Sequence, residues 1–263
     1  MDYSAKRITP EAAVKLVKSG DVIVTGLGGA EGRLFLQALH TVADQVNNVT
    51  VTNCLPMSDA AFMGETYKNS FFVDGWFYSP TLRKAHKNGN ISFIPNHLHL
   101  AGIKRLAHKH TNIYVGSASM PDTHGYVSLS LSNTYEKRVI EEADLVILEI
   151  NPNMPYTLGD VELPLSDVDY VIEADYPAPV LPEGEVNEKD QKIGQFIADF
   201  IKDGDCIQLG IGGIPNAVAA ALVHKKDLGV HTEMLTTGLM RLAKMGVITG
   251  KYKQQHRGKM VCT

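Results

Sequence analysis

The residues best suited to chemistry lie in "QLGIGGIPNAVAAAL", residues 208–222, and in the "HTEML" segment that follows. A glycine turn between an apolar strand and a helix presents backbone N–H groups that can hold an anion or stabilise an oxyanion. Glu233 lies at the end of the next expected strand, where its carboxylate could act as a nucleophile or a general base. Two plainer interpretations stay open: a tight turn without a ligand, and an ordinary solvated glutamate.

The glycine turn does not fit the motifs that bind nucleotides. The dinucleotide fingerprint G-x-G-x-x-G would begin at Gly210 and Gly212, but Pro215 occupies the place of its third glycine. No Gly-Lys-Ser or Gly-Lys-Thr follows, so the P-loop is excluded as well. The turn is therefore neither a dinucleotide-binding fingerprint nor a P-loop.

The elements that position this turn occur twice in the chain. "KSGDVIVTGLGG" from Lys18 matches "KDGDCIQLGIGG" from Lys202 with a constant offset of 184 residues, 18 to 202. Each copy follows an amphipathic segment and leads from an apolar strand into a glycine loop, at residues 26–29 and 210–213. The repeat predicts two related α/β units.

Further apolar runs predict the remaining strands: "NVTVTNC", "ISFIPN", "TNIYVGSASM", "ADLVILEIN" and "DYVIEA" in the first unit, and "GVHTEML" in the second. Their alternation with helical segments favours mainly parallel sheets covered by helices. The proline-rich "YPAPVLPEGEVNE" separates the two units, and we expect domains at 1–181 and 182–263. The second has few strands, with another beginning at "GKMVCT", so we expect a fragment or a unit completed by a partner.

Composition limits the possible partners and location. The 263 residues are 44% hydrophobic and 21% charged, enough for a substantial core. No apolar run reaches the roughly 20 residues that span a bilayer, and the N-terminus lacks a signal peptide's apolar core, so a cytoplasmic location without membrane contact is expected. A net charge of −4 argues against nucleic-acid binding. Cys54, Cys206 and Cys262 form no CxxC pair, so neither disulfides nor a zinc site is expected.

The histidines and one long polar stretch are the remaining candidates. His97 and His99 would share a face if extended, and two imidazoles on one strand can chelate a metal. His108, His110 and His124 add no carboxylate or cysteine at ligand spacing, so no metal is expected. Residues 117–160 are rich in turn formers and predict loops of the kind that line substrate clefts.

Five fragments in order carry a resemblance across the whole chain: "SMPDTHGYVSLSLSN", "INPNMPYTLGD", "SDVDYVIEADYPAP", "GIGGIPNAV" and "KKDLGVHTEML". Together they resemble the acetyl-CoA hydrolase/transferase family, in particular its 4-hydroxybutyrate CoA-transferase and butyryl-CoA:acetate CoA-transferase branch. The resemblance implies two related CoA-transferase-type α/β domains with the active site between them, assembled as a homodimer or larger homo-oligomer. Family members continue well beyond the position of Thr263, which implies a truncated second domain.

The resemblance also implies roles for particular residues. Glu233, in the family's H-[ST]-E-M segment, would be the glutamate that becomes covalently acylated. The glycine segment would contact coenzyme A through Gln208, Leu209, Gly210, Ile211, Gly212 and Gly213. Acyl-CoA and a short-chain carboxylate such as acetate would be the substrates, with 4-hydroxybutyryl-, butyryl- or acetyl-CoA as the donor. No permanently bound cofactor and no metal would be needed.

The chain departs from the family pattern after the glutamate. An Asp-Gly pair is usual there, whereas this chain has Thr237 before Gly238. An acyl-CoA hydrolase, in which water takes the acyl group from the glutamate, is an alternative. A catalytically silent CoA-binding fragment is another.

Overall fold

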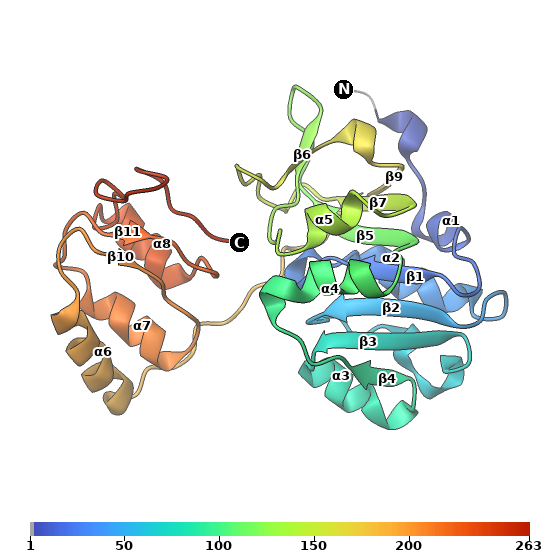
Figure 1. The fold of residues 1–263 in the computed structure, drawn as a ribbon, viewed down its shortest axis with the longest axis horizontal. Helices are drawn as coiled ribbons and strands as arrows, with labels where there is room; N and C mark the ends of the chain where they lie inside the picture. Colours follow the sequence, from blue (N-terminus) through green and yellow to red (C-terminus); the bar gives the residue numbers. More distant parts are fainter. Residues whose placement is uncertain (1–2) are drawn as a thin grey trace. The chain divides into compact units, whose positions relative to one another are not determined.

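The computed structural model describes residues 3–263 and has the expected α/β architecture. The chain forms two compact units, Met1–Pro179 and Val180–Thr263 (Figure 1). The division lies inside the proline-rich segment and just before the boundary expected between residues 181 and 182.

A seven-stranded parallel sheet forms the centre of the first unit (Figure 1). Its strand order is β4-β3-β2-β1-β5-β7-β9, so β1 lies inside the sheet. The strands are β1 Val22–Thr25, β2 Val49–Cys54, β3 Phe71–Phe77, β4 Ile91–Phe93, β5 Ile113–Ala118, β7 Leu145–Ile150 and β9 Tyr170–Glu173. Every residue of β1, β2 and β5 is buried, which explains why these strands are rich in apolar residues and contain no charged side chain.

Helices cover both faces of this sheet. On one face, Ala13, Phe35 and Leu82 of α1 Pro10–Val14, α2 Arg33–Ala38 and α3 Pro80–Ala85 join one apolar cluster. On the other, α4 Ala101–His108 and α5 Glu136–Ile140 contribute Ala101 and Val139 to a second cluster. Short 3-10 helices complete the unit: Ser4–Lys6, Gly28–Ala30, Leu39–Val42, Ala61–Met63, Glu65–Tyr67, His86–Asn88, Leu98–Leu100 and Leu165–Asp167.

Two features of the first unit differ from expectation. β3 was not predicted, because Asp74 and Gly75 interrupt its apolar run; in the structure the Asp74 carboxylate accepts a hydrogen bond from Ser92 Oγ at 2.8 Å. Within the polar stretch expected to form loops, residues 117–160, lies the strand β6 Tyr126–Ser128. It pairs antiparallel with β8 Glu162–Pro164, just beyond that stretch, with Val127 opposite Leu163. This pair is a separate two-stranded sheet, and β6 is labelled apart from the parallel strands in Figure 1.

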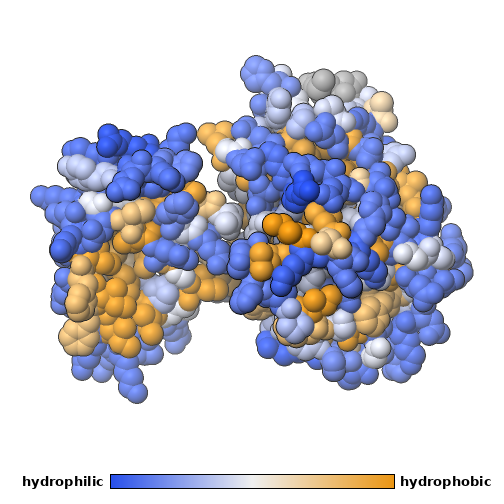
Figure 2. Space-filling view, viewed as in Figure 1, coloured by the Kyte–Doolittle hydropathy of each residue, from blue (hydrophilic) through white to orange (hydrophobic). Residues whose placement is uncertain are grey.

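The second unit contains fewer elements. They are α6 Glu188–Phe200, β10 Cys206–Ile207, α7 Gly213–Ala221, β11 Gly229–Val230 and α8 Thr237–Lys244. β10 and β11 form a two-stranded parallel sheet. The segment "GKMVCT", expected to begin a strand, forms an isolated parallel bridge between Val261 and His231. Around that bridge, Val261 N donates to the carbonyl of Val230 at 3.2 Å and Thr232 N donates to the carbonyl of Val261 at 2.9 Å. Large apolar side chains remain exposed over α6 and α7, among them Phe196 at 65% and Phe200 at 84% (Figure 2).

The internal repeat is reproduced in the backbone geometry. In the first copy Gly20 has φ +84° and the Asp21 carboxylate accepts the Lys18 N–H at 2.8 Å. In the second copy Gly204 has φ +83° and the Asp205 carboxylate accepts the Lys202 N–H at 2.7 Å. Both positive φ angles favour glycine, so matched residues build matched turns before β1 and β10.

Candidate functional site

The second glycine loop and Glu233 leave the same end of the β10–β11 sheet. Ile207 pairs with Val230, so the two strands end side by side. Beyond that pair, Thr232 Oγ1 donates a hydrogen bond to the carbonyl of Leu209 at 3.3 Å. The structure therefore brings the predicted CoA-contacting segment and the predicted nucleophile together within the second unit.

The loop itself requires glycine at two positions. Gly212 has φ +115°, a conformation that side chains rarely adopt, and a Cβ on Gly213 would lie 2.4 Å from an oxygen of Asp190. α7 starts at Gly213 with no side-chain cap on its first turn. The turn therefore leaves backbone N–H donors at the start of a nine-residue helix, the arrangement that suits an anion.

Glu233 lies in a bend after β11, so the expectation that its strand extends to this residue is wrong: β11 ends at Val230. Its side chain is exposed and makes no hydrogen bond or ion pair with any residue from 3 to 263. Only its backbone carbonyl is engaged, by Thr263 N at 3.2 Å and Thr263 Oγ1 at 3.1 Å. The carboxylate is free for a substrate, and its nucleophilic role stays a prediction.

The six predicted CoA contacts also stay a prediction. Leu209 is buried, Gly213 is half-buried, and the others are exposed: Gln208, Gly210, Ile211 and Gly212. After the glutamate, Thr236 caps α8 by accepting the Leu239 N–H at 3.4 Å. Thr237, where the resemblance implies an aspartate, is the first residue of that helix.

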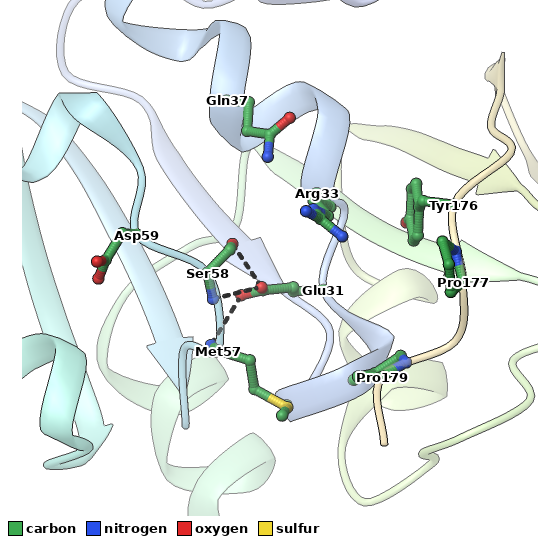
Figure 3. Close-up of a pocket in the computed structure, with 11 residues that line it drawn as sticks. Glu31, Arg33, Gln37, Met57, Ser58, Asp59, Tyr176, Pro177 and Pro179 are labelled. Carbon is green, nitrogen blue, oxygen red and sulfur yellow. Dashed lines mark hydrogen bonds between the residues drawn. The ribbon is translucent and has the colours of Figure 1, made fainter. Parts of the chain in front are cut away.

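A second candidate site is a cavity of about 280 Å³ in the first unit, beside the first glycine loop (Figure 3). It lies at the C-terminal end of the β1 and β2 strands, where open α/β sheets bind ligands. Its lining residues are Gly28, Gly29, Glu31, Arg33, Gln37, Met57, Ser58, Asp59, Tyr176, Pro177 and Pro179. Of these, the sequence analysis anticipated only the two glycines.

Glu31 is a buried carboxyl group on the wall of this cavity. It accepts hydrogen bonds from Ser58 N at 3.0 Å and Ser58 Oγ at 2.6 Å, and from Met57 N at 3.4 Å (Figure 3). Burial raises the pKa of Glu31, and these donors oppose that shift. Glu31 thus fixes the segment after β2 against the first glycine loop.

Glu149, behind the cavity, is fully buried on β7. Its carboxyl oxygens accept Phe35 N at 2.8 Å and Tyr176 Oη at 2.7 Å. Burial raises the pKa of Glu149 to about 7 and also raises the pKa of Tyr176. Neither Glu149 nor Tyr176 was expected to be functional; the one signal in the sequence is a single glutamate inside the apolar run "DLVILEIN".

The histidines form no comparable site. His97 and His99 have ring centroids 5.8 Å apart with planes tilted by 39°. His97 caps a 3-10 helix that contains His99, so the two residues do not lie on one extended strand. Across residues 3–263, no three or more His, Cys, Asp or Glu side chains are grouped to hold a metal. All three cysteines are unpaired. In the same part of the chain, no helix combines the length and apolar character needed to cross a membrane.

Comparison with known proteins identifies the family. The sequence model of the acetyl-CoA hydrolase/transferase N-terminal domain matches residues 1–182. The chain belongs to the acetyl-CoA hydrolase/transferase family. This confirms the resemblance found in the sequence.

Relatives within the family carry CoA-transferase names. The chain is 35% identical over 264 residues to a succinyl-CoA:cyclohexane-1-carboxylate CoA transferase of Geobacter metallireducens, covering all of this chain and 60% of that protein. It is 35% identical over 265 residues to a 4-hydroxybutyrate coenzyme A transferase of Clostridium kluyveri, covering 99% of this chain and 61% of that protein. The chain therefore spans about 60% of the length of these curated relatives.

Solved structures agree in fold. RipA from Yersinia pestis superposes with a TM-score of 0.94 at 29% identity, covering 100% of this chain and 65% of that one. A 4-hydroxybutyrate CoA-transferase from Porphyromonas gingivalis superposes with a TM-score of 0.85 at 32% identity, covering 99% of this chain and 62% of that one. The family fold thus extends over both units of this chain.

Proposed function

We propose that this chain is part of a CoA-transferase that moves CoA between a short-chain acyl-CoA and a carboxylate acceptor. The donor would be 4-hydroxybutyryl-, butyryl- or acetyl-CoA, and the acceptor an acid such as acetate. The observation that carries the proposal is the free, exposed carboxylate of Glu233 beside a glycine turn with uncapped N–H donors. The names of relatives such as the 4-hydroxybutyrate coenzyme A transferase support the substrate class.

The reaction begins with ionised Glu233. Its carboxylate attacks the thioester carbonyl of the acyl-CoA, the C–S bond breaks, and an acyl-glutamyl anhydride and CoA thiolate result. The thiolate then attacks the glutamyl carbonyl, which leaves a glutamyl-CoA thioester and releases the first acid. The acceptor carboxylate repeats the two steps in reverse, so the thioester bond is retained in the new acyl-CoA.

Each attack passes through a tetrahedral oxyanion. Backbone N–H groups near Gly212 and Gly213 are suitable donors to it, and one such donor typically contributes about 3 kcal/mol to the stability of the transition state. These steps require only a carboxylate and amide donors. We accordingly propose CoA and acyl-CoA as substrates, with no resident metal or redox cofactor.

Trapping the covalent intermediate tests this proposal. The protein is incubated with butyryl-CoA, treated with borohydride or hydroxylamine, and digested for mass spectrometry. We expect the modification on Glu233, its loss in Glu233→Gln, and its retention in Glu188→Gln, which removes another exposed carboxylate of the same unit. Modification at a different residue would contradict the assignment of the nucleophile.

The same protein separates transfer from hydrolysis. The exposure of Glu233 gives water access to an acyl-glutamyl anhydride, which favours an acyl-CoA hydrolase as the second candidate. Thioester loss that depends on added acetate supports transfer, whereas loss at full rate without acetate supports hydrolysis. CoA binding without turnover would indicate a catalytically silent CoA-binding fragment. Homodimer formation and a cytoplasmic location remain predictions of the resemblance and the composition.

A further inference from the structure

The cavity of the first unit contains one cation that no carboxylate neutralises. Glu31 is engaged by Ser58, and Asp59, at the edge of the cavity, forms an ion pair with Lys84 at 3.1 Å. Arg33 takes part in no ion pair with any residue from 3 to 263. Its guanidinium is therefore the group of the cavity that lacks a counter-charge.

Arg33 is also held in place by its surroundings. Its guanidinium lies over the ring of Tyr176, 5.4 Å from the ring centroid. The Tyr176 hydroxyl donates to Glu149, whose other oxygen accepts the N–H of Phe35, two residues after Arg33 on α2. The helix that carries Arg33 and the ring beneath its guanidinium are thus both tied to one buried carboxyl group, while the guanidinium itself stays exposed for a ligand.

The remaining walls suit a small amphipathic molecule. Met57, Pro177 and Pro179 provide apolar surface, and Gln37 adds an amide to the same cavity as Arg33 (Figure 3). The wall is closely packed at Gly29, because a Cβ atom at that position would lie only 2.7 Å from Pro179 Cγ. The volume of about 280 Å³ is about twice that of a cavity that holds benzene, enough for an acid of a few carbon atoms.

We infer that this cavity binds a short-chain carboxylate, with its carboxylate on Arg33 and its carbon chain against Met57 and the two prolines. A guanidinium presents two parallel N–H groups that match the two oxygens of a carboxylate. The choice of a carboxylate over another oxyanion rests on the proposed function, which requires an acceptor acid. The anion site itself rests on the geometry of the first unit.

Isothermal titration calorimetry tests the inference with butyrate, succinate and inorganic phosphate as ligands. The proteins are the unmodified chain, Glu233→Gln, Arg33→Gln, and Arg83→Gln as the matched control. Arg83 is an exposed arginine of α3 that lies outside the cavity and forms no ion pair with residues 3–263. We expect one butyrate per chain, an affinity at least tenfold weaker in Arg33→Gln, and unchanged affinity in Arg83→Gln and Glu233→Gln.

A second variant addresses the apolar wall. Met57 is 48% exposed, so Met57→Trp is compatible with folding and should fill the cavity and abolish butyrate binding without removing any charge. Circular dichroism confirms that each variant is folded. Equal butyrate affinity in the unmodified chain and Arg33→Gln, or no carboxylate binding at all, would overturn the inference. Tighter binding of phosphate than of either carboxylate would overturn the ligand class.

These measurements are separable from the test of the proposed function. Butyrate binding that depends on Arg33, together with failure to trap an intermediate on Glu233, would support the cavity assignment and contradict the nucleophile. Trapping of an intermediate on Glu233, together with a butyrate affinity that does not depend on Arg33, would support the nucleophile and contradict the cavity assignment.

Discussion

Glu149 accepts hydrogen bonds from one backbone N–H and one phenol, and it is fully buried. Glu233, in contrast, is exposed and unpartnered within residues 3–263. The two glutamates show how position decides the use of the same side chain: a buried carboxyl group organises the backbone around it, whereas an exposed one is available for reaction with a substrate.

The raised pKa of Glu149 predicts a pH-dependent stability. The pKa of Glu149 is about 7 in the folded protein and 4.5 ordinarily. Between pH 4.5 and pH 7, the folded protein therefore keeps a proton on Glu149 that the unfolded chain has released. Its contribution to stability is therefore present at low pH and lost as pH rises towards 7. Relative to Glu149→Gln, the free energy of unfolding should fall by about 2 to 3 kcal/mol between pH 5 and pH 8.

Urea denaturation of both proteins at the two pH values measures this difference. Glu188→Gln serves as a control, since it removes an exposed carboxyl group and should track the unmodified chain. Parallel changes in the unmodified protein and Glu149→Gln would contradict the prediction.

Some of the site could be predicted at the residue scale. Gly212 and Glu233 stand in local patterns whose residue types suggest their chemistry, so both could be selected from the sequence. Arg33, Glu149 and Tyr176 could not, because their relation is spatial: Glu149 bonds to a backbone group 114 residues away. Local sequence carries no information on which distant N–H group a buried carboxylate will meet.

At the scale of elements, the packing of α6 against α7 depends on one glycine. A Cβ on Gly194 would lie 2.7 Å from the backbone carbon of Ala217 and 2.9 Å from Val218 N. Backbone atoms cannot move aside as a flexible side chain can, so the helices would have to separate.

We therefore predict that Gly194→Ala destabilises the second unit by roughly 1 to 3 kcal/mol despite the higher helix propensity of alanine. Gly210→Ala is the matched control in the same unit, since a Cβ there would have only Pro215 at 4.0 Å. Hydrogen exchange followed by mass spectrometry should show faster exchange in α6 and α7 for Gly194→Ala alone. Equal protection in the two variants would contradict this account of the helix contact.

The elements differ in how far they could be predicted. The strands β2, β5 and β7 were predicted because both of their faces are buried, which favours runs rich in apolar and β-branched residues. β3 was missed because a charged residue in it is satisfied by a neighbouring strand, which the sequence of β3 alone does not reveal. β11 is shorter than expected, since it ends at Val230 and the chain bends at Glu233. Beyond Val230, the Thr232 hydroxyl bonds to the carbonyl of Leu209, which follows β10.

At the scale of the whole molecule, the two units are joined by an exposed segment. Val180 is 82% exposed and Leu181 is 57% exposed, and residues 174–187 contain no helix or strand. Exposed connections without regular structure are the usual sites of proteolytic cleavage.

We predict that a glutamate-specific protease cleaves first after Glu183 or Glu185. Mass spectrometry of a time course should show two fragments that meet in this segment before any smaller product appears. Glu141 and Glu142 provide an internal comparison, because they are also exposed but directly follow α5 in the first unit. Earlier cleavage at that pair would show that the connection is better protected than its exposure suggests.

The position of β1 inside its sheet has a consequence for synthesis on the ribosome. β1 to β4 follow one another both in the chain and across the sheet, so they can pair as they emerge. The other edge of β1 must wait for β5, which begins at Ile113. Until β5 is made, the nascent chain exposes the free edge of β1, a strand that is buried in the folded protein. Unpaired backbone groups on an apolar strand are prone to associate with other chains. A pause in translation between β4 and β5 would therefore prolong the interval in which this protein most needs a chaperone.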